Sequence, residues 1–156
     1  METNPYFHLY EPYRIDESRA QSDAQLVIEI QKAVNGAYNA VACYAKLANL
    51  APTKEEKTRI LGILADAKNH LKIFTQLYIN LSGEQPAFQL TDDCPDTYDA
   101  GIDFAFLNKQ KTVDFYLSLA DQIRDTSARE KVRRAAADEQ HHAVWFLYFL
   151  NNLQKA

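Results

Sequence analysis

Hydrophobic residues recur every three or four positions along four separate stretches of the chain, which is the spacing of one face of an α-helix. The first stretch covers about residues 22–50, with apolar positions from Leu26 through Leu47. Pro52 follows it, and proline cannot continue a helix. The pattern therefore predicts a long amphipathic helix that ends near Leu50.

The second stretch carries clear boundary signals. Thr53 and Glu56 have the spacing of a capping box, in which each side chain satisfies backbone N–H groups at the helix start. The apolar stripe then runs from Ile60 to Leu81, and Gly83 is the expected stop because glycine readily takes the left-handed conformation that ends helices.

Two more helices follow a connection rich in proline and aspartate, at about residues 84–99. The third helix is expected over about residues 100–124. Ser127 and Glu130 repeat the capping-box spacing, so the fourth is expected to begin there and to end near Leu153. The aromatic residues 1–21 are expected to be irregular, which leaves one domain, the bundle of residues 22–156.

Connection lengths predict how the helices are arranged. The two short connections make two antiparallel helix hairpins. A helix of about 25–28 residues is roughly 40 Å long, and an extended chain of about 15 residues reaches ~50 Å. The long connection can therefore climb the whole bundle and start the third helix parallel to the second. One such crossover gives an all-α, ferritin-like four-helix bundle.

The two halves of the chain also repeat each other. When the sequence is shifted by 72 positions, twelve residues between 30 and 81 meet an identical residue, without a gap. Similar amphipathic hairpins would match in leucine and alanine, but not readily in polar residues at one constant offset. We interpret this as a duplication, with the two hairpins related by a pseudo-twofold axis. The polar matches are Tyr44 with Tyr116, Asp66 with Asp138, His70 with His142, and Asn80 with Asn152.

The second half holds a metal-ligand spacing. Glu139 and His142 are three residues apart, on one helix face. A Glu-x-x-His pair from each of two helices, with one Glu from each of the other two, builds a di-iron or di-manganese site inside a bundle. Carboxylates bridge and neutralise the two cations, and imidazoles complete their coordination.

At these residues the chain resembles the rubrerythrin-like branch of the ferritin-like superfamily, in the small bacterial group without a rubredoxin tail. The resemblance runs from about Leu26 to Leu153 and is most specific at AAADEQHHAVWF, residues 135–146. It implies that His70, Glu139 and His142 match metal ligands. It also implies that Asp66 and Asp138 each orient the histidine of the opposite hairpin, and that Tyr44 and Tyr116 lie near the site as hydrogen-bond donors.

Three positions depart from the family's pattern. Where it expects glutamate, this chain has Ala37, Ala67 and Lys109. The internal repeat agrees, since Ala67 is the partner of Glu139 and Ala37 is the partner of Lys109. Of four expected carboxylates, only Glu139 remains. Two divalent ions would leave a large positive charge beside Lys109, so a normal di-iron centre is disfavoured.

Two alternatives stay open for the residual site. His70, Glu139 and His142 are the ligand types of a site for a single divalent metal, although in the family each histidine serves a different ion. The favoured alternative has no metal: Lys109 occupies the metal's place and pairs with Glu139, because a buried ammonium must be paired.

Three functions follow from these alternatives. The favoured one is a degenerate ferritin-like protein without redox turnover, a structural or binding module. The second is a rubrerythrin-like oxidoreductase that uses iron or manganese to reduce peroxide or oxidise iron. Because the chain has no CxxC pair, such an enzyme would need an external electron donor. The third is a mononuclear metal-binding protein. Whether the chain is an enzyme is left open.

Composition and charge exclude several classes of function and location. A net charge of -4 argues against nucleic-acid binding, which needs a basic surface. No apolar run approaches the ~18 residues of a membrane span, and no signal peptide is apparent. Cys43 and Cys94 lie far apart, so we expect no disulfide, a buried Cys43, and a cytoplasmic protein. The aromatic run Trp145–Phe149 covers more than one helix face, which indicates either a homodimer or packing of the N-terminal segment on the bundle, and a homodimer is expected.

Overall fold

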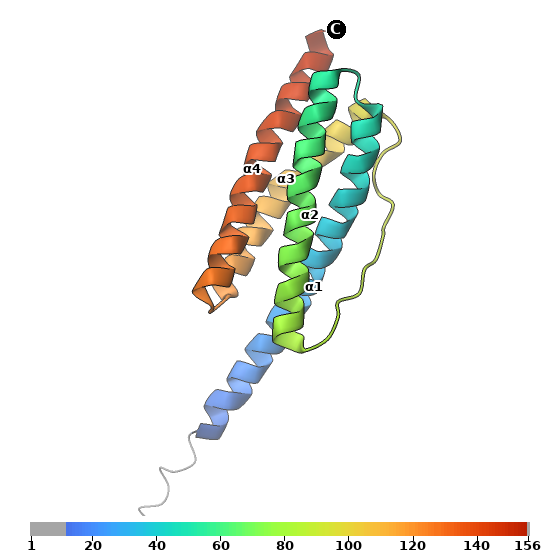
Figure 1. Cartoon of the computed structure of the whole chain (residues 1–156). Coiled ribbons are helices and arrows are strands. Elements are labelled where there is room, and N and C mark those ends of the chain that lie inside the picture. Colours follow the sequence, from blue (N-terminus) through green and yellow to red (C-terminus); the bar gives the residue numbers. More distant parts are fainter. Residues whose placement is uncertain (1–11, 156) are drawn as a thin grey trace, which may run out of the picture.

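The computed structural model describes residues 12–155 of the chain, with side chains from residue 19 onward. This part of the chain is all-helical and has no strand (Figure 1). None of its helices is long and apolar enough to cross a lipid bilayer. The four helices are α1 (Pro12–Leu50), α2 (Lys54–Ser82), α3 (Tyr98–Gln122) and α4 (Thr126–Lys155).

Helix α1 begins about ten residues earlier than the hydrophobic pattern predicted. Its first residue is Pro12, a position where proline is tolerated because the first N–H of a helix has no partner within the helix. The prediction of an irregular segment up to residue 21 was therefore wrong from Pro12 onward, and its remainder, residues 1–11, lies outside the described residues. The first turns of α1 extend beyond the other helices (Figure 1).

The predicted ends of α2 are confirmed. Thr53 is the N-cap, and its hydroxyl oxygen accepts a hydrogen bond from the backbone N–H of Glu56 at 3.1 Å. The Glu56 carboxylate in turn accepts from the Thr53 hydroxyl at 2.7 Å. Gly83 ends the helix at φ 75°, and its N–H donates to the carbonyl of Ile79.

The start of α4 differs from the prediction. The helix begins at Thr126, and the Asp125 carboxylate accepts a hydrogen bond from the backbone N–H of Ala128 at 2.8 Å. Asp125 therefore does what was expected of Ser127. Both residue types cap helices well, so two adjacent candidates competed, and the one that directly precedes the helix makes the bond.

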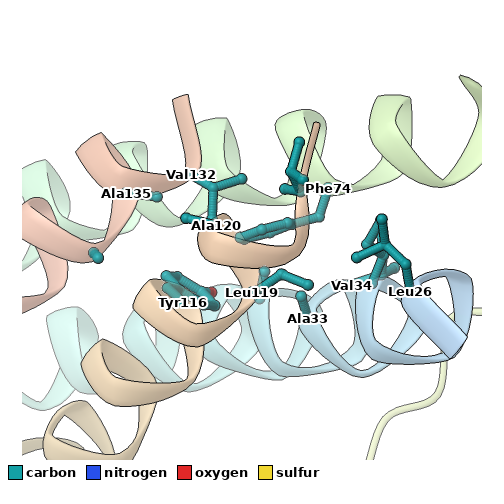
Figure 2. Close-up of a cluster of buried hydrophobic side chains, with 13 residues drawn as sticks. Leu26, Ala33, Val34, Phe74, Tyr116, Leu119, Ala120, Val132 and Ala135 are labelled. Atoms are coloured by element: carbon teal, nitrogen blue, oxygen red, sulfur yellow. The ribbon is translucent and has the colours of Figure 1, made fainter. Parts of the chain in front are cut away.

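The core consists of two apolar clusters, one toward each end of the bundle. One is built around Ile30, Phe74 and Leu119, and Figure 2 shows its side chains meeting between the helices. The other is built around Leu47 and Phe146. On α2, α3 and α4 the two clusters are separated by a short stretch that carries four buried ionisable side chains, His70, Lys109, Glu139 and His142.

The connection between α2 and α3, residues 83–97, runs alongside α1 in the same direction (Figure 1). We call it the crossover. Side-chain amides of α1 bind its backbone in sequence order. Gln31 bonds both the N–H and the carbonyl of Ala87, and Asn39 accepts from the N–H of Thr91 at 2.8 Å. The crossover therefore reaches the end of the bundle where α2 started, so α2 and α3 run parallel, as predicted.

This series of hydrogen bonds, which we call the amide ladder, requires that the spacing of residues along the helix match the spacing along the extended crossover. Gln31, Asn35 and Asn39 are four residues apart, and they bond crossover residues two apart: Ala87, Gln89 and Thr91. Four helical residues rise about 6 Å, and two residues of extended chain span about 6.6 Å. The periods agree, so amides on one face of α1 can satisfy an extended segment that has no sheet partner.

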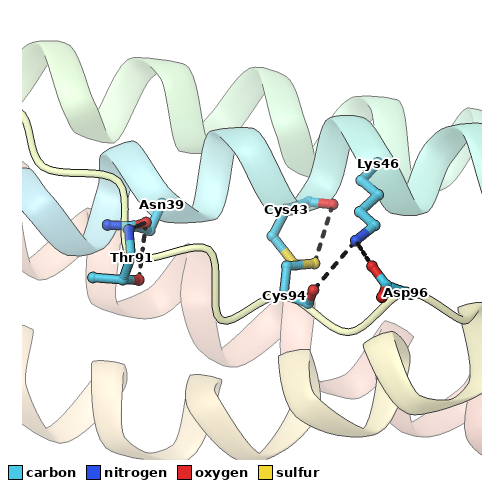
Figure 3. Close-up of a disulfide and its surroundings, with 6 residues drawn as sticks. All are labelled: Asn39, Cys43, Lys46, Thr91, Cys94 and Asp96. Carbon is cyan, nitrogen blue, oxygen red and sulfur yellow. Dashed lines mark hydrogen bonds and ion pairs between the residues drawn. A yellow bond between two sulfur atoms is a disulfide. The ribbon is translucent and has the colours of Figure 1, made fainter.

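A disulfide between Cys43 and Cys94 continues the same face of α1 (Figure 3). The prediction that these cysteines stay unpaired was therefore wrong. They are 51 residues apart in sequence, but the crossover brings their Cα atoms to 5.4 Å, within the range a disulfide bridges. The predicted burial of Cys43 is confirmed.

Candidate functional site

Four ionisable side chains meet between the two apolar clusters: His70 from α2, Lys109 from α3, and Glu139 and His142 from α4. We call them the central cluster, and all four are buried. The ammonium of Lys109 lies 2.5 Å from Oε2 of Glu139. This is the pairing that the sequence predicted, and it gives the buried lysine the opposite charge that it needs.

The two members of this pair hold each other in the charged state. Burial alone would raise the pKa of Glu139, but the charge of Lys109 and the close approach of Lys109, His142 and His70 lower it far below its usual range. Burial alone would lower the pKa of Lys109, but attraction and a hydrogen bond to the Glu139 carboxylate outweigh it, and the pKa is raised. Each partner therefore makes the charge of the other tolerable, as expected for a buried ion pair.

The other carboxylate oxygen of Glu139 faces both histidines. Oε1 lies 3.2 Å from Nδ1 of His70 and 3.6 Å from Nδ1 of His142. The two imidazole rings are stacked, with centroids 6.3 Å apart. Nδ1 of His142 is buried and has no hydrogen-bond partner, so one polar atom of the central cluster is left unsatisfied.

Each histidine also contacts an aspartate of the other hairpin. Nε2 of His70 lies 3.1 Å from Asp138, and Nε2 of His142 lies 2.7 Å from Asp66. The two contacts are reciprocal at the 72-residue offset, as the family resemblance implied. Arg134, one turn before Asp138 on α4, donates to its other oxygen at 3.1 Å. The aspartates therefore fix the orientation of both rings.

The aspartate contact also affects the ionisation of His70. Burial would lower the pKa of His70, but hydrogen bonds and attraction from Glu139 and Asp138 outweigh it, and the pKa is raised. The imidazolium form of His70 is therefore favoured next to these two carboxylates.

The two tyrosines predicted near the site are buried beside the central cluster. The Tyr44 ring centroid lies 4.7 Å from the Lys109 ammonium, within cation–π range. Tyr116 presents its ring at right angles to that of His70, with centroids 6.3 Å apart. Burial is the main cause that raises the pKa of both hydroxyls, so both are neutral near pH 7.

The three positions that depart from the family's pattern come together beside this cluster. Ala37, Ala67 and Lys109 line one cavity of about 100 Å³, together with His70 and Glu139. Two methyl groups and an ammonium thus stand at the positions where the resemblance expects carboxylates. These residues do not fit a di-metal centre, because the negative charge such a centre requires is replaced by one positive charge.

For a single metal ion, the distances between possible ligand atoms are suitable, but other observations argue against binding. Ligand atoms about 2.1 Å from a tetrahedral ion lie roughly 3.4 Å from one another, close to the two distances between Glu139 Oε1 and the Nδ1 atoms of His70 and His142. Within residues 12–155, however, no group of three or more His, Cys, Asp or Glu side chains is arranged to hold a metal ion. The Lys109 ammonium also contacts Oε2 of Glu139, so this oxygen already has a cationic partner.

Two features near the site were missed in the sequence. Arg134 supports Asp138, and its i, i+4 spacing to that aspartate was a usable signal. The disulfide between Cys43 and Cys94 had no such signal in the sequence.

His141 is exposed, as its place on the helix indicated, and accepts a hydrogen bond from the Trp145 ring N–H at 3.2 Å.

The aromatic run on α4 divides between core and surface. Phe146 and Phe149 are buried, whereas Val144, Leu147 and Tyr148 are largely exposed. The homodimer inferred from this run stays a prediction.

Comparison with known proteins identifies one relative. No protein-family model matches the chain, and no solved structure matches it significantly. The chain is 42% identical to "Uncharacterized protein YhjR" of Bacillus subtilis (strain 168) over 141 residues, which cover 90% of this chain and 95% of the relative. At this identity and coverage, the chain belongs to the same family as YhjR.

Proposed function

We propose that this protein is a ferritin-like helical module, resembling rubrerythrins, that works without di-iron redox turnover. In this proposal the place of the metal centre is taken by the central cluster of His70, Lys109, Glu139 and His142. The protein would then act through its surface or a partner, and the cluster would set the stability and register of the four helices.

The observation that carries the proposal is the ion pair between Lys109 and Glu139. Both side chains are buried, and the ammonium contacts the one carboxylate that the residual site retains. A cation bound to Glu139 would have to displace this ammonium or lie next to it. Displacement is costly because it leaves the buried ammonium without a partner. A cation next to the ammonium is costly because like charges repel strongly where water is excluded.

A second candidate, a mononuclear metal-binding protein, is favoured by one observation. Nδ1 of His142 is buried without a hydrogen-bond partner, and it faces the same Glu139 oxygen as Nδ1 of His70. An unsatisfied imidazole nitrogen next to a second imidazole and a carboxylate is the donor set of a single Zn²⁺ or Fe²⁺ ion. When bound, such an ion would supply Lewis-acid chemistry.

Metal content per chain separates the two candidates. The full-length protein would be purified without chelator or affinity metal and analysed by mass spectrometry, before and after incubation with ferrous iron and with zinc. No metal in any sample is the result expected for the metal-independent module. About one ion per chain would favour the mononuclear site, and about two would overturn the module.

Matched variants locate any bound ion. If one ion binds at the central cluster, His142→Gln should abolish binding and Lys109→Met should strengthen it. His141→Gln is the control, because His141 is the neighbouring residue and is exposed. Binding that survives His142→Gln would place the ion elsewhere on the protein.

A further inference from the structure

We propose that the Cys43–Cys94 disulfide is a reversible redox site, cleaved by dithiols, that fastens the crossover over a pocket leading to the central cluster. The proposal goes beyond the function given above and does not depend on whether the cluster binds a metal.

The pocket lies between α1, the crossover and α3, and its volume is about 330 Å³. Both cysteines line it, so the disulfide borders a space that a small solute can enter. The crossover contributes Thr91, Asp92 and Asp93 to the wall. Asp92 has a φ of 54°, a left-handed conformation that aspartate tolerates better than most residues, and it lies two residues before Cys94.

This pocket shares wall residues with the cavity beside the central cluster. The two share Gly36, Ala40, Tyr44 and Asn108. Tyr44 directly follows Cys43 in α1, and its ring contacts the Lys109 ammonium. The disulfide and the buried ion pair are therefore linked through neighbouring residues of one helix and through adjoining cavities.

The disulfide is the main anchor of this part of the crossover. Upstream, Asn39 holds the backbone on both sides of residue 90, at Gln89 and Thr91. Beyond Thr91, Lys46 of α1 donates hydrogen bonds to the Cys94 carbonyl and to the Asp96 carboxylate. The Asp96 side chain is 96% exposed, and exposed ion pairs hold weakly. Cleavage would leave residues 92–96 loosely attached (Figure 3).

The reaction requires a dithiol reductant and moves two electrons. Cys94 is only partly buried, whereas Cys43 is 5% exposed, so the attacking thiolate is expected to reach Sγ of Cys94. A mixed disulfide forms at Cys94, and Cys43 leaves as a thiolate that takes a proton. The second thiol of the reductant then attacks the reductant sulfur that is bonded to Cys94. This releases Cys94 as a thiol and leaves the reductant as a cyclic disulfide.

The first experiment treats the folded, full-length protein with dithiothreitol in the absence of denaturant. Mass spectrometry should report a gain of two hydrogens, reversible on reoxidation. The backbone order parameters of residues 90–96, measured by nitrogen-15 NMR, should fall from about 0.85 to below about 0.6, while those of α2 and α4 stay unchanged. Resistance of the disulfide until the protein is denatured would overturn the proposal, and so would reduction that leaves the order parameters of residues 90–96 unaltered.

Two variants make the test specific. Cys43→Ser with Cys94→Ser should show low order parameters in residues 90–96 with and without dithiothreitol. Asn39→Ala is the matched control, since it removes a non-covalent anchor of the same crossover and keeps the disulfide. Its residues 92–96 should keep high order parameters until dithiothreitol is added. Low order parameters there in oxidised Asn39→Ala would assign the anchoring to the amides of α1 instead.

Access to the central cluster needs its own readout. The ammonium protons of Lys109 can be followed by nitrogen-15 NMR and assigned by their loss in Lys109→Met. Their exchange with water should be slow in the oxidised protein and faster after reduction. Equal rates in both states would show that the disulfide does not control the route from the pocket.

Discussion

The ammonium of Lys109 lies 2.5 Å from Oε2 of Glu139, and neither side chain is accessible to solvent beyond a few per cent. A buried ion pair need not make a protein more stable than apolar residues in its place would. It does make each partner indispensable to the other, because removal of one leaves an uncompensated charge. Several consequences of the fold and the central cluster can be tested.

The first test concerns this dependence. Glu139→Ala should lower the free energy of unfolding by about 3–5 kcal/mol, because it leaves the Lys109 charge buried without a partner. The double variant Lys109→Met with Glu139→Leu should lose much less. Urea denaturation of the single and double variants measures the difference. A single variant within about 1 kcal/mol of the unmodified protein would contradict the importance of the pair.

The pH dependence of stability should reflect His70. Its pKa is raised in the folded state, so its protonation stabilises the fold below the unfolded pKa, and this contribution is lost as the pH rises through the folded pKa. Unfolding free energies should therefore decline as the pH rises above 6.5, the ordinary pKa of the imidazole. Asp138→Asn should lower the pKa of His70, followed by NMR, and flatten the decline. An unchanged His70 titration in that variant would argue against the Asp138 contact.

Restoration of the missing carboxylates tests the family resemblance. The triple variant Ala37→Glu, Ala67→Glu and Lys109→Glu should gain affinity for iron, because all three positions border the cavity that also contains His70 and Glu139. Metal analysis after anaerobic incubation with ferrous iron measures the gain. Asp138→Asn in the triple background should weaken it. A triple variant that is folded yet binds no iron would mean that the ligand positions were misplaced.

The disulfide should stabilise the chain by constraining its unfolded state. Cys43 and Cys94 are 51 residues apart, and the chain-entropy relation gives a contribution on the order of 4 kcal/mol for a loop of this length. Urea denaturation of the oxidised protein and of Cys43→Ser with Cys94→Ser should reveal this difference. It should vanish when both are measured in reductant, and a difference that persists would have another origin.

The contact between α1 and α3 depends on a glycine. A Cβ atom added at Gly101 would lie 2.2 Å from Cδ2 of Leu47, which is fully buried and has little room to move. Gly101→Ala should therefore destabilise the protein by about 1–3 kcal/mol through overpacking. Gly62→Ala is the control. No atom lies near a Cβ there, so better helix propensity should stabilise it by roughly 0.5–1 kcal/mol. Thermal and urea denaturation of the two variants should shift in opposite directions.

Local sequence determined the helices and much of the central cluster. The three-and-four spacing of apolar residues identified all four elements, and Thr53 and Gly83 marked the ends of α2, because caps are interactions within a few residues. The 72-residue offset paired His70 with His142 and Asp66 with Asp138. The contacts of each histidine with the aspartate of the other hairpin were implied by the resemblance to rubrerythrins, and the repeat showed that both halves keep the residues for them.

Only the tertiary structure decided which distant residues meet outside that repeat. The path of the crossover along α1 depends on amides four residues apart matching an extended segment, and it brings Cys94 to Cys43. Nothing in the spacing of two lone cysteines encodes that approach. The two oxygens of Glu139 likewise serve different partners, Lys109 on one side and the histidines on the other. Such choices depend on side-chain geometry in the packed bundle, whereas periodicity specifies only which residues face inward.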